Sequence, residues 1–143
     1  MLIDSKYLRN RSWLVPLLCT LLSLSDCGSD SHPKLPVGVV DLPTANQAIS
    51  GAFDAAGWAI SEDRIARVSV YVDGNYLKDC TLGVSRPDVS KVFPGVPDGE
   101  RAGWTTQVDT ASLPPGKHEL LFEVQSSKGA IRDIGAIPVE IVH

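Results

Sequence analysis

The sequence predicts an all-β fold, a sandwich of two antiparallel sheets with one short helix, and three observations support this prediction. No stretch of the 143 residues keeps a 3.6-residue apolar period over the length of an ordinary helix. Turn-forming residues are frequent, with 12 glycines and 10 prolines. Short alternations of apolar and polar residues recur between these turns, which is typical of seven or eight strands in two packed sheets.

The first 26 residues have the pattern of a signal peptide. Lys6, Arg9 and Arg11 give a positive start, and a mostly apolar run follows over residues 13–24. These twelve residues are fewer than the roughly 20 that a membrane-spanning helix needs. They suit the apolar core of a secretory signal.

Residues 24–31, Leu-Ser-Asp-Cys-Gly-Ser-Asp-Ser, resemble the lipobox of bacterial lipoproteins. The resemblance implies that Cys27 carries lipid, including palmitate, and that the protein is anchored in a bacterial cell envelope. Gly28 favours the outer membrane if the cell is Gram-negative. Asp26 departs from the pattern, which has Gly, Ala or Ser before the cysteine. The efficiency of processing therefore depends on whether the lipoprotein pathway tolerates an aspartate at this position. The alternatives are ordinary signal cleavage, giving a secreted or periplasmic protein, and retention of the segment as an anchor.

Charge and cysteine content restrict the function classes. Cleavage before Cys27 would leave 143 − 26 = 117 residues, with 10 basic and 15 acidic side chains and a formal charge of −5. No basic surface for nucleic acid is therefore expected, nor attraction to an anionic membrane beyond the lipid itself.

Cys80 would be the single remaining thiol beside Cys27. No disulfide is then available within the domain, so a hydrophobic core must hold the fold. We expect Cys80 to be a packed residue rather than a reactive one.

A polar tether is predicted over residues 27–43, followed by the sandwich domain over residues 44–143. The tether contains glycine, serine, aspartate and three prolines, although residues 37–40 could pair as an edge strand. The first two strands of the domain are predicted at residues 46–53 and 57–60, with a short link between them.

The most regular strand pattern begins after Arg64. Val68, Val70 and Val72 alternate with polar residues, which is the period of a half-buried strand. Asp73-Gly74 then supplies the positive φ angles of a two-residue hairpin turn, and residues 75–81 return as the partner strand. A lone hairpin is marginal in water, so a second sheet must cover the valines. This turn predicts three cross-strand pairs: Val72 with Asn75, Tyr71 with Tyr76 and Val70 with Leu77.

Residues 81–102 lack strand periodicity, and a short helix is predicted within them over residues 86–92. Ser85 would be its N-cap, with Pro87 in the first turn and Asp88 as the capping-box partner. The apolar side chains of this helix would then cover an open end of the sandwich. They are Val89, Val92 and Phe93.

Three further segments alternate as strands. Residues 104–109 direct Trp104, Thr106 and Val108 inward, and residues 118–126 direct Leu120, Phe122 and Val124 inward. Residues 131–134 and 137–141 complete the chain, with Ile137, Val139 and Ile141 on one face.

Several short segments together resemble a bacterial immunoglobulin-like module. They span residues 48–142 and comprise Gly57-Trp-Ala, Val68-Ser-Val-Tyr-Val-Asp-Gly74, Arg86-Pro-Asp-Val89, Ala102-Gly-Trp104, Asp109-Thr-Ala-Ser-Leu-Pro-Pro-Gly116 and Lys117-His-Glu-Leu120. The resemblance implies an immunoglobulin-like sandwich in an extracytoplasmic setting, often beside glycan-active domains. It implies no defined activity.

No catalytic, cofactor or metal site is predicted. His32, His118 and His143 lie without a nucleophile signature, and His118 is expected to hydrogen-bond backbone across the Leu113-Pro-Pro-Gly116 corner. No Cys/His spacing fits zinc. Loop acids could collect around calcium, although none has EF-hand spacing. They are Asp54, Asp63, Asp73, Asp98 and Glu100.

The candidate binding residues lie on the outer face of the predicted hairpin: Arg67, Tyr71, Tyr76 and Lys78. Tyrosine and arginine are enriched in interface hot spots, although the tyrosines could equally be a cross-strand pair that stabilises the sheet. Structural roles are expected for Trp58 and Trp104 as core anchors, rather than sugar platforms. Arg86 is expected to bond loop carbonyls or a carboxylate such as Asp109.

The sequence therefore predicts a non-enzymatic envelope lipoprotein whose module contacts a protein or a glycan. One alternative is a structural or assembly lipoprotein without a small ligand. The other is an inhibitor of an envelope hydrolase, or a hydrolase itself, and for an inhibitor residues 94–101 would be the inserted loop.

Overall fold

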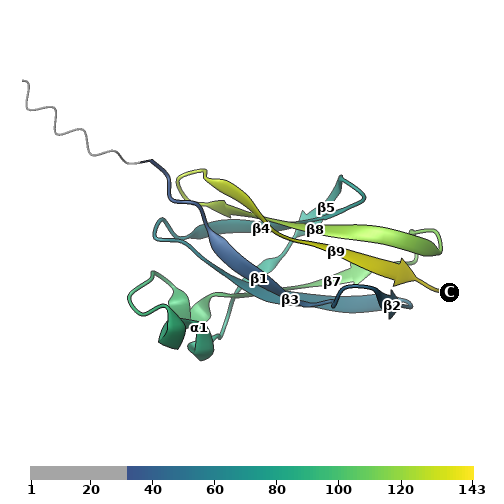
Figure 1. The fold of residues 1–143 in the computed structure, drawn as a ribbon, viewed down its shortest axis with the longest axis horizontal. Helices are drawn as coiled ribbons and strands as arrows, with labels where there is room; N and C mark the ends of the chain where they lie inside the picture. The colour runs from purple at the N-terminus through teal and green to yellow at the C-terminus, as the bar shows by residue number, and fades with distance from the viewer. Residues whose placement is uncertain (1–31) are drawn as a thin grey trace, which may run out of the picture. The chain divides into compact units, whose positions relative to one another are not determined.

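Two sheets face each other across a shared apolar interior, which confirms the predicted sandwich (Figure 1). The computed structural model describes residues 32–143. One sheet has the strand order β1 (Val37–Leu42), β3 (Ala52–Ile60), β7 (Gly103–Asp109), β6 (Thr81–Val84). The other has the order β2 (Gln47–Ile49), β9 (Ile131–Ile141), β8 (Gly116–Ser126), β4 (Ile65–Val72), β5 (Asn75–Asp79).

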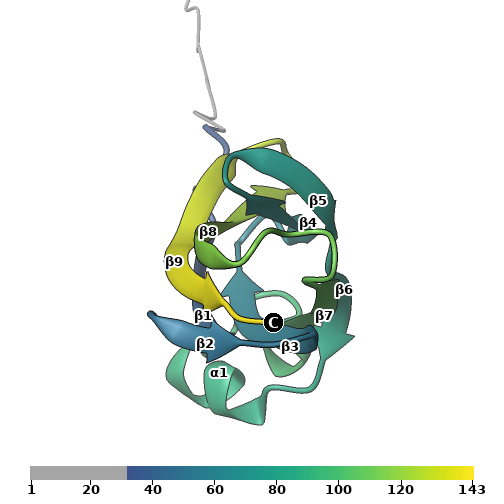
Figure 2. The same ribbon diagram turned by 90° about the vertical axis from the view of Figure 1, so that its right-hand side faces the viewer.

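The sheets are antiparallel except at one edge, where β2 runs parallel to β9. The end-on view shows the two layers with the interior between them (Figure 2). No helix within residues 32–143 is both long and apolar enough to cross a membrane.

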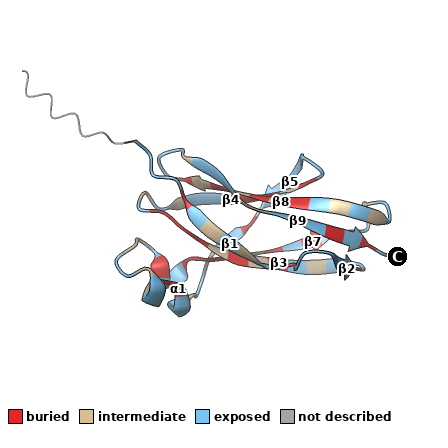
Figure 3. Cartoon of the chain, viewed as in Figure 1, coloured by how far each residue is buried: buried red, intermediate tan, exposed pale blue. Residues whose placement is uncertain are grey.

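Inward-facing side chains from alternate strand positions form the core, seen as alternating buried segments in Figure 3. Val68 and Val70 are fully buried and Val72 is 6% exposed, as the alternation predicts. Trp104 of β7 stacks on Phe122 of β8 across the interior, with ring centroids 5.0 Å apart. The remaining predicted inward positions of β7 and β8 are also buried.

Two predictions about the first strands were wrong. The predicted strand at 46–53 is broken by Gly51, which has φ +71°, into the short β2 and the start of β3. The expected link at 54–57 is instead the middle of β3, a continuous nine-residue strand paired with both β1 and β7. Alanines and a glycine fill this segment, so it lacks the bulky alternation that marks a strand in sequence.

Residues 37–42, placed in the tether with the option of an edge strand, form β1 and pair with β3. The sandwich therefore includes residues before 44. Residues 131–141, expected as two pieces, form the single strand β9.

The chain changes sheets at Cys80. The predicted partner strand at 75–81 ends at Asp79, and β6 begins at Thr81 in the opposite sheet. Cys80 itself is buried, and its amide donates to Val68 O at 2.8 Å. A strand was not expected after residue 81, because the bulge at Gly83 interrupts the alternation of β6.

The predicted helix is present as α1 (Pro87–Val92), but its cap differs. Arg86 occupies the N-cap position and no side chain caps the helix, so the roles assigned to Ser85 and Asp88 were wrong. Val89 is buried beside Ile60, whereas Val92 is 70% exposed and covers nothing. A 3-10 turn, η1 (Gly99–Arg101), follows the helix.

Candidate binding face

The β4–β5 hairpin has the predicted turn, with Asp73 at φ 49° and Gly74 at φ 80°. Tyr71 pairs with Tyr76 and Val72 with Asn75, as expected. The third predicted pair was wrong, because a bulge between Val70 and Tyr71 places Lys78 opposite Val70 and leaves Leu77 unpaired.

That bulge removes Lys78 from the tyrosines. Cross-strand partners point to the same side of a sheet, so Lys78 lies on the side of the buried Val70. Its amine donates to the Gln107 carbonyl of the facing sheet at 3.1 Å. The lysine therefore spans the open side of the sandwich and is not part of the outer face.

The residues that do share the outer face of the hairpin form a polar and aromatic surface, which we call the tyrosine face. The two tyrosine rings meet edge to face, with centroids 5.7 Å apart and an interplanar angle of 77°. Tyr76 is 58% exposed, and Tyr71 is half-buried beside it. The members of the tyrosine face are Arg67, Tyr71, Tyr76, Asp79 and Glu123.

Glu123 and Asp79 were not predicted for this face. The Tyr71 hydroxyl donates to Glu123 Oε1 of β8 at 3.3 Å, and Ser69 Oγ donates to Asp79 Oδ1 at 2.7 Å. Partial burial of the hydroxyl raises the pKa of Tyr71, and the negative charge and hydrogen bond of Glu123 raise it further. The hydroxyl therefore stays a donor at neutral pH. Alternation in β8 places Glu123 on an outer face, but nothing in the sequence pairs β8 with β4.

His118 bridges the corner and the hairpin turn. Its Nε2 lies 2.7 Å from Pro114 O, the expected backbone contact across the corner, and its Nδ1 lies 2.6 Å from Asp73 Oδ2. Both partners are acceptors, so both ring nitrogens donate only when the imidazole is protonated. The carboxylate and the carbonyl accordingly raise the pKa of His118. Hydrogen bonds from the Glu119 amide and from His118 lower the pKa of Asp73.

This bridge predicts a specific pH dependence of stability. A raised histidine pKa contributes stability fully below about pH 6.5 and loses it as pH rises through the folded-state value. The lowered Asp73 pKa contributes above about pH 4 and is lost as pH falls. Stability should therefore be greatest between these limits. Urea unfolding from pH 5 to 8, below the range in which the Cys80 thiol ionises in the unfolded chain, should show the decline with rising pH in wild type and in His143→Gln, but not in His118→Gln. A constant difference between wild type and His118→Gln across this range would contradict the bridge.

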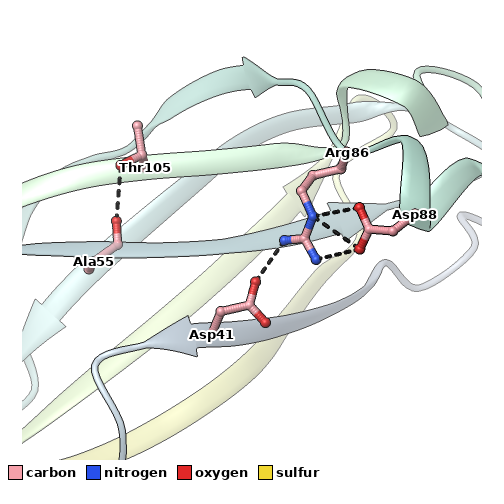
Figure 4. Close-up of polar contacts among 5 residues, drawn as sticks. All are labelled: Asp41, Ala55, Arg86, Asp88 and Thr105. Carbon is pink, nitrogen blue, oxygen red and sulfur yellow. Dashed lines mark hydrogen bonds and ion pairs between the residues drawn. The ribbon is translucent and has the colours of Figure 1, made fainter.

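Arg86 connects the loop before α1 to the edge strand β1 on the outer face of the four-stranded sheet (Figure 4). Its guanidinium bonds both oxygens of Asp88 and donates to Asp41 Oδ2 at 2.6 Å. Arg86 thus bonds carboxylates, as expected, although these do not include Asp109, which instead accepts from the Ala111 amide. The stem of Arg86 crosses β7 at Gly103, where a Cβ would lie 3.0 Å from it. Asp88 and Asp41 raise the Arg86 pKa further, so the residue is a fixed cation that joins two elements.

The two tryptophans differ in position. Trp104 lies in the core between the sheets, as predicted. Trp58 is half-buried on the outer side of β3 and packs against Phe93, with ring centroids 5.7 Å apart. Its predicted role as an anchor between the sheets was therefore wrong.

Other candidate residues are engaged elsewhere or lie outside the described part of the chain. Burial raises the pKa of Cys80 to about 12, which fits a packed thiol. Asp63 pairs with Lys128, and Asp98 with Arg64. Within residues 32–143 no three acidic, histidine or cysteine side chains gather as metal ligands. Cys27 and the signal segment lie outside the described residues.

Comparison with known proteins informs the fold alone. No protein-family model matches the chain. No curated protein matches it. The chain is similar in structure to the endo-β-1,4-mannanase from Thermotoga petrophila, at 14% identity and a TM-score of 0.56, over 80% of this chain and 21% of the mannanase chain. It also resembles fibronectin(III)-like modules of Clostridium thermocellum CbhA, at 17% identity and a TM-score of 0.49, over 75% of this chain and 45% of that one.

The chain thus spans about a fifth of the mannanase chain to which it is similar. The likeness to the mannanase chain, together with the two sheets, shows a β-sandwich fold.

Proposed function

We propose that this chain is a non-catalytic binding module that contacts a protein or a glycan through the tyrosine face. The observation that carries the proposal is the edge-to-face pair of Tyr71 and Tyr76, held outside the packed core. Tyr76 is exposed although it is large and partly apolar, and Arg67 lies beside it. Such a combination is enriched in interface hot spots and can stack on sugar rings.

Preorganisation supports the same proposal. The edge-to-face contact and the Tyr71–Glu123 hydrogen bond fix one tyrosine and orient the other. The His118 bridge holds the turn that joins their strands. A ligand would therefore meet side chains that are already ordered, which lowers the entropy cost of binding.

The expected effect of removing the exposed ring is large. Tyr76→Ala should weaken binding about thirtyfold or more, because hot-spot truncations cost about 2 kcal/mol or above. The measurement is a glycan array and a crosslinking pull-down from envelope extract, each compared with wild type. Val92→Ala, which truncates a more exposed apolar side chain on α1, is the matched control and should bind normally. Unchanged binding by the Tyr71→Ala/Tyr76→Ala double variant would eliminate the tyrosine face as the binding surface.

We also propose that the module is tethered to a bacterial envelope by lipid on Cys27, behind a cleaved signal peptide. The lipobox resemblance of residues 24–31 supports this location. Radiolabelled palmitate should enter the wild-type chain and should be absent from Cys27→Ser, with Cys80→Ser as the control that keeps its label. Absence of label in the wild-type chain would mean that Asp26 prevents processing and that the protein is not lipidated.

The inhibitor alternative gains no support from the loop over residues 94–101. Gly99 is buried, Val96 packs beneath α1, and Asp98 is paired with Arg64. These contacts tie the loop to the body of the domain, whereas an inserted inhibitory loop needs an extended, accessible segment.

A further inference from the structure

A second feature of the surface lies away from the tyrosine face, at the end of the sandwich where β4 begins. A cleft of about 280 Å³ opens there between the two sheets and the loop that carries η1. Its apolar walls come from Ala59, Ile65, Leu82 and Pro97, and its polar groups include Asp98 and Arg101. This volume lies just under the roughly 300–1,000 Å³ typical of drug-sized ligands, so the cleft suits a smaller molecule.

Arg101 supplies a cation at this cleft. Its Nε donates to the Gly83 carbonyl at 3.2 Å, which fixes the guanidinium over β6. Gly83 has φ +89°, and a Cβ there would lie 3.5 Å from Arg101 Nη2, an ordinary contact distance, so the guanidinium lies directly over this residue. Within residues 32–143, no hydrogen bond or ion pair engages the two terminal nitrogens of Arg101. These are the nitrogens with which arginine binds a carboxylate in bidentate fashion.

An ion pair borders the same cleft. Arg64 Nη1 donates to both oxygens of Asp98, at 2.8 and 2.7 Å. Both residues have left-handed backbones, with φ 61° and 60°, which is uncommon outside glycine and recurs at ligand clamps. Of the side chains that line the cleft, Asp98 and Arg101 are charged, and their charges sum to zero. Because Arg64 already neutralises Asp98, the Arg101 guanidinium is the charge left to attract an anion, although the protein as a whole is negative.

We propose that this cleft binds a small monocarboxylate with an aromatic or branched apolar tail. The carboxylate bonds the terminal nitrogens of Arg101, and the tail packs between Ile65, Leu82 and Pro97. Burial of the tail and the charge-assisted hydrogen bonds both favour this class over neutral or cationic molecules of the same shape.

The test is a titration of the full-length chain in detergent with 3-phenylpropanoate, followed by the backbone amide NMR signals of Gly83, Ala102 and Gly103. These signals should shift with a dissociation constant of about 1 mM, as expected for a ligand of this size. The neutral 3-phenylpropanamide should bind about tenfold more weakly or worse, because it cannot form the ion pair. Absence of shifts up to about 20 mM carboxylate, or equal binding of acid and amide, would overturn the proposal.

Three variants distinguish binding in the cleft from non-specific electrostatic attraction of the carboxylate to the protein surface. Arg101→Gln should weaken carboxylate binding about tenfold or more while leaving the amide affinity unchanged. Leu82→Trp, at a partly exposed position, should fill the cleft and abolish binding of both molecules. Lys117→Gln removes a positive charge at the other end of β8 and should leave binding unchanged. Equal weakening by Lys117→Gln and Arg101→Gln would show a diffuse charge effect and contradict the site, as would normal binding by Leu82→Trp.

Discussion

Gly57→Ala should destabilise the sandwich by about 3 kcal/mol, a large effect for one methyl group. A Cβ at this position would lie 2.1 Å from the Val39 carbonyl oxygen and 2.5 Å from Trp104 Cζ2. Neither neighbour can retreat easily, since the carbonyl belongs to the paired strand β1 and the indole is 1% exposed. For a domain of this size we expect the midpoint of thermal unfolding to fall by roughly 12–24 °C, measured by circular dichroism.

Gly99→Ala is the matched control. Gly99 is also buried, but an added Cβ would meet nothing closer than 3.6 Å. This substitution should change the midpoint by only a few degrees. Similar midpoints for the two variants would show that the close approach of β1 to β3 does not limit the size of the side chain at residue 57.

Trp104→Ala should cost about 3–5 kcal/mol, the largest truncation in the core. The indole fills the interior between Gly57 and Phe122, so its truncation leaves a cavity between the sheets. Equilibrium unfolding in urea would measure the loss, while the slope of the transition should stay close to that of wild type. Full stability of this variant would contradict the place of Trp104 in the core.

Trp104→Phe distinguishes packing from hydrogen bonding. The Trp104 Nε1 is buried without a hydrogen-bond partner among the described residues, and such an unsatisfied donor carries a desolvation penalty of about 1–3 kcal/mol. Phenylalanine keeps part of the packing and removes this donor, so we expect a loss of about 1 kcal/mol. A loss as large as that of Trp104→Ala would indicate that the indole N–H has a partner.

Much of the fold could be predicted because strong alternation survives in the central strands. Val68, Val70 and Val72 identify β4, and Asp73-Gly74 specifies the turn that follows. The strands that glycine interrupts, and those built from small residues, were missed because they lack this alternation. In β3 the inward residues are Ala55, Gly57 and Ala59, whose size is set by the partner strand and by Trp104, and neither is visible in the local sequence.

The candidate face was predicted in part. The Tyr71–Tyr76 pair follows from the turn alone, and the structure contains it. Lys78 was misplaced because a single-residue bulge reverses every later side chain of the strand, and no sequence signal marks this bulge. Glu123 and the cleft at Arg101 depend on contacts between distant segments, which periodicity cannot supply.

The parallel pairing of β2 with β9 has a mechanical consequence. The chain enters the sandwich at Val37 and leaves it after Ile141, and these points lie toward opposite ends of the long axis (Figure 1). A pull between them drags β2 and β9 in opposite directions along their length. Their hydrogen bonds are then loaded in shear and must break together rather than one after another. Because β1 lies between the pulled end and β2, such a pull would load the β1–β3 pairing together with this three-residue strand.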